Sequence, residues 1–215
     1  MARQTAEDIY EAIKQQILSG DLRPAERLIE ANLAKSLNAS RHHIRAALDR
    51  LHIDGLVEIE ANKGARVSSL TLEEVVDLYV AREGMEAEVV RLAVKRITDA
   101  EISELGDCLQ EMAVAFESGQ FDEYSKLNQR FHGIIFSASG NETLPEYIAQ
   151  IRLRLARLNV RVILLPGRSD SSHQEHTAIY EALGDRHTER AIEAIRRHIS
   201  GVRQDIEKGW AIVGM

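Results

Sequence analysis

Three histidines and one asparagine in the second half of the chain have the residue types and the spacing of a metal site. Asn128 and His132 are four residues apart, which places them on one face of a predicted helix. His176 and His198 each lie among apolar residues at helical spacing, so both are expected to face a core. Imidazole is the commonest protein ligand for divalent transition metals. If the three helices pack together, the histidines converge, with Asn128 as an oxygen ligand beside them.

A buried histidine without a metal is the alternative interpretation of each of these residues. One histidine on an apolar stripe is more often a hydrogen-bonded core residue than a ligand. Three of them on three helices favour a site for a divalent cation, with zinc as the first expectation and nickel or manganese as the others. A three-histidine site with an open coordination position suits ligand sensing, and it also suits a metal-dependent, hydrolase-like enzyme.

The first half of the chain carries a different pattern, in which two short helices flank a tight break. An apolar helix ends near Leu37, and Ser40 is placed to cap a second helix that begins with basic residues. Helices that read DNA enter the major groove at their N-terminal end, where arginines meet phosphates and guanine edges. The DNA contacts predicted for this helix are Ser40, Arg41, His42, His43 and Arg45. Its opposite face is predicted to pack inward through Ile44, Leu48, Leu51 and Ile53.

The segment after this helix is predicted to form a wing, a two-stranded ribbon beside the recognition helix. Residues 56–67 are predicted to form two short strands around the turn Asn62-Lys63-Gly64. Lys63 lies at the tip and Arg66 on the return strand, so the ribbon can reach a phosphate or a neighbouring groove. The order of helix, turn, basic helix and basic wing predicts a winged helix-turn-helix, in which Lys63 and Gly64 also contact DNA.

Charge is distributed unequally along the chain. The 215 residues carry a formal net charge of −7, but residues 1–69 hold ten basic and ten acidic side chains, so the acidic excess lies in the remainder. A neutral part with a local basic patch suits DNA binding, whereas the acidic part is expected to avoid DNA. No apolar run approaches the ~20 residues that span a bilayer, and a single cysteine excludes an intrachain disulfide. The sequence therefore predicts a cytoplasmic protein with no membrane partner.

The remaining sequence predicts helices throughout. A helix over residues 6–18 begins the winged domain, and capping residues with Gly and Pro breaks predict six more helices after residue 70. Their expected ranges are 71–98, 98–118, 122–139, 143–165, 169 or 170 to 183, and 188–210, with capping boxes at Thr71–Glu74, Thr98–Glu101 and Thr143–Glu146. The expected fold is mainly α, with an N-terminal winged helix-turn-helix over residues 1–69 and an all-α helical bundle over residues 70–215.

On these residues the chain resembles the GntR family of bacterial transcription regulators, and within it the FadR-like branch whose all-helical effector-binding domain is called FCD. In the first half the resemblance is carried by Gly20-Asp21-Leu22-Arg23-Pro24, Leu28-Ile29-Glu30, Leu33-Ala34, Ser40-Arg41, Ile44-Arg45-Ala46-Ala47-Leu48, Leu51, Asp54-Gly55-Leu56-Val57 and Lys63-Gly64-Ala65-Arg66-Val67. In the second half it is carried by Ala81-Arg82-Glu83-Gly84-Met85-Glu86, Asn128-Gln129-Arg130-Phe131-His132, Ser139-Gly140-Asn141, Glu175-His176, Ala182-Leu183-Gly184-Asp185 and His198-Ile199. The resemblance covers nearly the whole chain.

For the winged domain, the resemblance implies that Arg41 and Arg45 contact operator bases or phosphates and that Lys63 and Gly64 contribute from the wing. One departure lies at His42-His43, where the family usually has a small polar residue followed by Pro. This departure bears on which operator sequence is bound, and not on whether DNA is bound.

For the helical domain, the resemblance implies a divalent ion held by an Asp, by a His four residues later, and by one His on each of the last two helices. The three histidines match, but Asn128 stands in the place of the Asp. Its carbonyl oxygen can coordinate an ion, yet it brings no negative charge. Arg82 matches a position that can face the ligand cavity, where it would either clamp a carboxylate effector or pair with Glu86 four residues on.

The sequence is most consistent with a ligand-responsive, DNA-binding transcription regulator that is not an enzyme. Its expected partners are double-stranded operator DNA, a small carboxylate effector near the metal, and a second copy of the chain. A homodimer is expected because one recognition helix reads few base pairs, and two half-sites supply the needed specificity. Repression relieved by the ligand is the expected response, with activation as the alternative. The metalloenzyme is the rival hypothesis, but it leaves the winged domain without a purpose, and no obvious general base lies beside the set of histidines in sequence.

Overall fold

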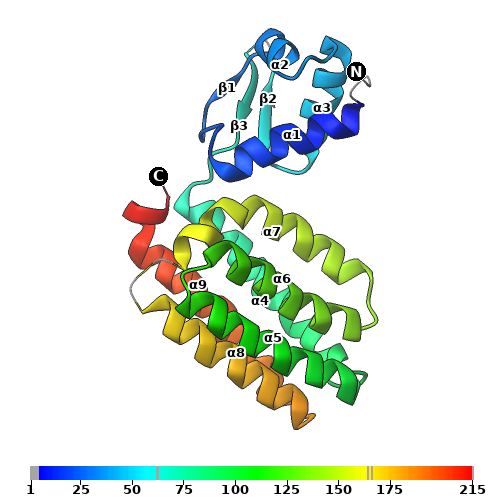
Figure 1. The fold of residues 1–215 in the computed structure, drawn as a ribbon, viewed down its shortest axis with the longest axis vertical. Helices are drawn as coiled ribbons and strands as arrows, with labels where there is room; N and C mark the ends of the chain where they lie inside the picture. Colours follow the sequence, from blue (N-terminus) through cyan, green and yellow to red (C-terminus); the bar gives the residue numbers. More distant parts are fainter. Residues whose placement is uncertain (1–4, 62, 164, 166, 215) are drawn as a thin grey trace. The chain divides into compact units, whose positions relative to one another are not determined.

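The computed structural model forms two compact units (Figure 1). One unit comprises Met1–Leu70 with Arg152–Arg157, and the other comprises Thr71–Ile151 with Leu158–Met215. Within these bounds the structure describes residues 5–61, 63–163, 165 and 167–214. The described residues form nine helices and one three-stranded sheet, which confirms the mainly α fold expected from the sequence.

The first unit combines three helices with the small sheet. Its helices are α1 (Ala6–Ser19), α2 (Glu30–Ser36) and α3 (Arg41–Ile53), and its strands are β1 (Arg27–Leu28), β2 (Val57–Glu60) and β3 (Gly64–Val67). The strands lie in the order β1-β3-β2, and both pairs are antiparallel. Strands β2 and β3 are the predicted wing. Strand β1 was not predicted, because two residues are too few to show the alternation that marks a strand in sequence.

A shared apolar core fixes α3 against the rest of this unit. Helix α1 begins after the capping box of Thr5 and Asp8 and buries Ile9, Tyr10, Ile13 and Ile17. Helix α3 buries Ile44, Ala47, Leu48 and Leu51, as its apolar stripe predicts. The prediction for Ile53 was wrong, because its side chain is 84% exposed. Two residues advance a helix by about 200°, so Ile53 points away from the face that Leu51 buries.

The second unit is a helical bundle. Its helices are α4 (Leu72–Ala93), α5 (Asp99–Glu117), α6 (Phe121–Ala138), α7 (Thr143–Val162, apart from Arg152–Arg157), α8 (Arg168–Gly184) and α9 (Thr188–Val213). The most extensive pairings join α4 to α9, α5 to α6 and α8 to α9. No helix formed by the described residues is long and apolar enough to cross a membrane.

Capping residues set most of the helix starts in the bundle. The boxes predicted at Thr71–Glu74 and Thr98–Glu101 are both present. Helix α4 stops at Ala93, short of the expected residue 98, and residues 94–96 form a turn before Thr98, which is extended and caps the next helix. The box predicted at Thr143–Glu146 was wrong, since the backbone N–H of Leu144 donates to Asn141 Oδ1 at 2.8 Å and Thr143 is already helical.

The starts of the last two helices also differ from the prediction. Helix α8 follows Gly167, whose φ of 78° lies in the left-handed region, and it begins at Arg168 rather than at residue 169 or 170. The predicted break at Pro166 lies outside the described residues. Helix α9 is capped by His187, whose side chain accepts a hydrogen bond from the backbone N–H of Arg190.

Candidate metal centre and DNA-binding face

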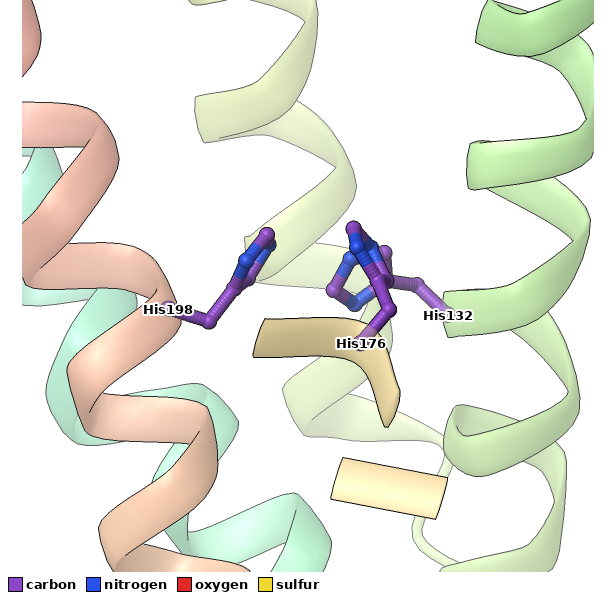
Figure 2. A group of neighbouring side chains, drawn as sticks. All are labelled: His132, His176 and His198. Atoms are coloured by element: carbon purple, nitrogen blue, oxygen red, sulfur yellow. The ribbon is translucent and has the colours of Figure 1, made fainter. Parts of the chain in front are cut away.

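Each of three helices contributes one histidine to the interior of the bundle (Figure 2). His132 comes from α6, His176 from α8 and His198 from α9, and all three side chains are buried. One ring nitrogen of each lies within 4.8 Å of one ring nitrogen of both others. The ring centroids are 4.5 Å apart for His176 and His198, and 5.5 Å apart for His132 and His176. The structure therefore brings together the three histidines that the sequence singled out.

The hydrogen bonds of two of these histidines suit a metal ligand. His176 Nδ1 lies 2.6 Å from the carbonyl oxygen of Ser172, and His198 Nδ1 lies 2.9 Å from Glu175 Oε2. Metal-binding histidines commonly donate one ring N–H to a carbonyl or carboxylate, which leaves the other nitrogen for the ion. Among the described residues, His176 Nε2 has no hydrogen-bond partner although it is buried. Buried polar atoms normally have a partner, and a bound cation would supply one for this nitrogen. These residues therefore fit a divalent cation.

The pKa values of the same two histidines are consistent with this role. Burial lowers the pKa of His176 and that of His198 well below the ordinary value, and the neighbouring histidines lower them further. Both rings are therefore neutral at physiological pH, and the neutral ring is the form that binds a metal.

An ion pair from α4 borders the cluster. Arg82 Nε donates to Glu86 Oε1 at 2.5 Å, and the other carboxylate oxygen of Glu86 lies 3.4 Å from His132 Nδ1. The side chains of Arg82 and Glu86 are 5% and 0% exposed. Of the two roles expected for Arg82, the pairing with Glu86 is the one that the structure shows. The charge of this guanidinium is therefore largely balanced before any effector arrives.

A second ion pair fixes the carboxylate beside His198. Arg168, the first residue of α8, donates to both oxygens of Glu175, and its Nη1 also donates to Asp205 Oδ2 at 3.2 Å. Arg168 is 4% exposed. The sequence alone indicated no role for Arg168, Glu175 or Asp205. Its only available signal was the dipeptide Glu175-His176, which puts a carboxylate next to a predicted ligand.

Asn128 is the predicted oxygen ligand. It lies on α6 one turn before His132, and its side chain is half-buried. Among the described His, Cys, Asp and Glu side chains, the three histidines form the only cluster with metal-ligand spacing. No carboxylate of the described residues shares the mutual spacing of this cluster, and coordination by Asn128 stays a prediction.

The recognition helix and the wing present the predicted DNA contacts. Ser40 caps α3, because its hydroxyl accepts a hydrogen bond from the backbone N–H of His43 at 3.2 Å. Arg41, His42 and Arg45 are exposed, and His43 is half-buried. In the wing, Lys63 and Gly64 are exposed, and Gly64 has a φ of 89°, which favours glycine in the turn. Asn62, the first residue of the predicted turn, lies outside the described residues.

A winged helix-turn-helix joined to a helical bundle defines a class of DNA-binding transcription regulators. Comparison with known families places the chain within that class. The profile for bacterial regulatory proteins of the gntR family matches residues 5–67, and the FCD domain profile matches residues 77–201. The chain therefore belongs to the GntR family and carries an FCD domain, as the resemblance in sequence implied.

Curated relatives and solved structures agree with this assignment. The chain is 36% identical over 187 residues to the Nta operon transcriptional regulator of Aminobacter aminovorans, which covers 85% of each chain. It is 30% identical over 207 residues to the transcriptional repressor GlaR of Escherichia coli, covering 91% of this chain and 92% of GlaR. The E. coli McbR/YncC structure has a TM-score of 0.78 at 21% identity, covering 98% of this chain and 100% of that one, and it supports the fold alone. The two sequence relatives are named as transcription regulators, and so the metalloenzyme hypothesis is set aside.

Proposed function

We propose that the protein is a homodimeric repressor whose affinity for operator DNA is lowered by a small carboxylate, bound beside a divalent cation in the FCD domain. The observation that carries the proposal is the buried histidine cluster, in which acceptors at Nδ1 of His176 and His198 leave the other ring nitrogens for an ion. His132, His176, His198 and Asn128 would hold the ion, with zinc as the first candidate and nickel or manganese as the others. When bound, the ion supplies an open coordination position for a carboxylate oxygen.

The charge balance of the site favours an anionic effector. Arg82 is paired with Glu86, and Arg168 is paired with Glu175 and Asp205. The three ring ligands are neutral when they bind metal, and the fourth candidate is an uncharged amide. The two ion-paired groups together carry one net negative charge, so a divalent ion would leave the buried site with a net positive charge, where an anionic ligand is favoured. Arg82 would contribute to this attraction, although the ion would dominate it.

Repression and dimerisation rest on different support. The relative from E. coli at 30% identity is named a transcriptional repressor, and this supports repression here. Dimerisation follows from the size of one recognition helix, because a single α3 can read only a few base pairs. Two copies on a near-palindrome would supply the affinity and the specificity that an operator requires.

The proposal is tested with the full-length protein and a duplex that it selects from a random-sequence library. Binding of that duplex is measured by fluorescence anisotropy while mono-, di- and tricarboxylates are added, first with zinc present and then after chelation. At least one carboxylate is expected to release the duplex when zinc is present and to have little effect without it. Release that is identical in both conditions would contradict the role of the metal, and no release by any carboxylate would contradict the effector class.

The Asn128→Asp variant tests whether position 128 reaches the ion. A carboxylate is a stronger ligand than an amide, so metal affinity should rise by about one to two orders of magnitude. The added negative charge should at the same time weaken a carboxylate effector bound to the ion. Calorimetry with zinc, and then with the carboxylate found above, measures both effects.

Gln129→Glu is the matched control for this variant, because it adds the same charge to the exposed face of the same helix. It should leave both affinities close to those of the wild type. If Asn128→Asp also changes neither affinity, Asn128 does not touch the ion.

A further inference from the structure

A carboxylate on α2 holds the guanidinium of Arg45, the arginine expected to read DNA. Arg45 Nε donates to Glu30 Oε1 at 3.2 Å, and Arg45 Nη2 donates to Glu30 Oε2 at 3.0 Å. The two bonds form a fork between Glu30, the first residue of α2, and the outer face of α3. This bond also lowers the pKa of Glu30 and raises that of Arg45, so both groups are charged at physiological pH.

The exposure of the two side chains shows which one faces outward. The side chain of Arg45 is 68% exposed, whereas that of Glu30 is 35% exposed. Both residues line a hollow of about 530 Å³ that also includes Gly64 of the wing. Arg45 thus remains accessible on the face between the recognition helix and the wing, with Glu30 as its more shielded partner.

The fork uses only one edge of the guanidinium. Glu30 occupies the edge formed by Nε and Nη2, and the edge that includes Nη1 remains for the O6 and N7 atoms of a guanine. An arginine held by two parallel hydrogen bonds also has fewer rotamers to lose when it binds. Glu30 can therefore fix the direction of Arg45 before DNA arrives.

The basic side chain at the tip of the wing has a different kind of partner. Lys63 contacts Glu60 three residues earlier in the same hairpin, and the lysine side chain is 78% exposed. Glu60 also contacts Arg66 Nη2 at 3.1 Å. An ammonium on a flexible stem makes a point contact, which suits a phosphate and imposes no fixed direction. The Lys63–Glu60 pair is thus a matched case in which a carboxylate neutralises a base without orienting it.

We propose that Glu30 is a positioning residue for DNA recognition, which aims Arg45 at a base edge and so sets sequence specificity. The inference rests on the proposed role of α3 as the reading helix. As a fixed negative charge beside the DNA-binding face, Glu30 would also repel phosphates and thereby weaken binding to unrelated sequences. Loss of Glu30 should therefore weaken specific binding and strengthen non-specific binding.

The test compares two duplexes of equal length and base composition: the sequence selected by the wild-type protein from a random library, and a scrambled version of it. Dissociation constants are measured for the full-length protein and for Glu30→Gln, which removes the charge, and Glu30→Asp, which keeps the charge but shortens the reach. Both variants are expected to reduce the ratio of specific to scrambled affinity, Glu30→Gln by about tenfold, because both half-sites lose part of their discrimination. Single-base changes in the duplex should show this loss at the guanine of each half-site that Arg45 is proposed to read.

Two controls separate orientation from charge. Glu60→Gln removes the same charge from the shared partner of Lys63 and Arg66, and it should raise affinity for both duplexes about equally and leave their ratio unchanged. In an Arg45→Ala background, Glu30→Gln should no longer change the ratio. If Glu30→Gln raises both affinities by the same factor, or leaves the ratio unchanged, Glu30 is only a counterion and the inference is wrong. If the wild type enriches no sequence at all, the proposed function fails together with it.

Discussion

Replacing Arg45 with alanine is expected to abolish sequence-specific DNA binding while leaving the fold intact. Arg45 lies on the exposed face of α3, opposite the core residues Ile44, Leu48 and Leu51, so its removal opens no cavity. A bidentate contact between arginine and guanine discriminates by roughly tenfold to a hundredfold, and a dimer loses it at both half-sites. Specific affinity should therefore fall to the level of non-specific binding, which a gel-shift or anisotropy titration measures directly.

Lys63→Ala is the matched comparison for this prediction, because it also removes one exposed positive charge from the winged domain. A phosphate contact carries no sequence information, so this variant should weaken binding to all duplexes to a similar extent and reduce the salt dependence. Thermal melting should show that both variants remain folded. If Arg45→Ala binds the selected duplex as tightly as the wild type does, α3 is not the reading helix.

Local sequence signals predicted most of the DNA-binding unit. Ser40 identified the start of α3 because a serine hydroxyl can accept the N–H that a helix start leaves unpaired, and the structure shows that bond. The apolar alternation of residues 56–67 identified the two wing strands. The fork between Glu30 and Arg45 was not predictable in the same way, because its two residues lie fifteen positions apart and meet only after α2 packs on α3.

In the candidate metal centre, too, some features were predictable from the sequence and others were not. Three histidines on apolar stripes predicted that the rings would meet, because helices that pack together bring their buried faces to a common interior. The apolar stripes do not predict which polar side chains lie beside the histidines. Glu86 and Arg168 approach the cluster from α4 and from the start of α8, and each is part of an ion pair whose geometry depends on how the helices pack. Such partners need a structure, because spacing along one helix says nothing about the next helix.

Removing a bound metal is expected to lower the melting temperature and to change how stability depends on pH. An ion that binds only the folded state at one hundred times its Kd adds about 2.7 kcal/mol, which corresponds to roughly 5–10 °C for a chain of this size. Chelation should therefore lower the melting temperature by about that amount, and added zinc should restore it. His176→Ala should abolish the response to zinc. His173→Ala, at an exposed position on the same helix, should retain it.

The dependence on pH follows from the lowered pKa values of His176 and His198, which are caused first by burial. Both rings stay neutral in the folded state, whereas in the unfolded chain they take up protons below their ordinary pKa of 6.5. The unfolded state then binds more protons, so stability is complete above that pH and falls as the pH drops towards the lowered values, by about 1.4 kcal/mol per histidine and pH unit. Protons also displace a metal from the same rings, so zinc should protect less as the solution becomes acidic. Calorimetric melting between pH 8 and pH 5, with and without chelator, measures both effects. A melting temperature that responds neither to chelator nor to zinc would show that the three histidines are core residues without a metal.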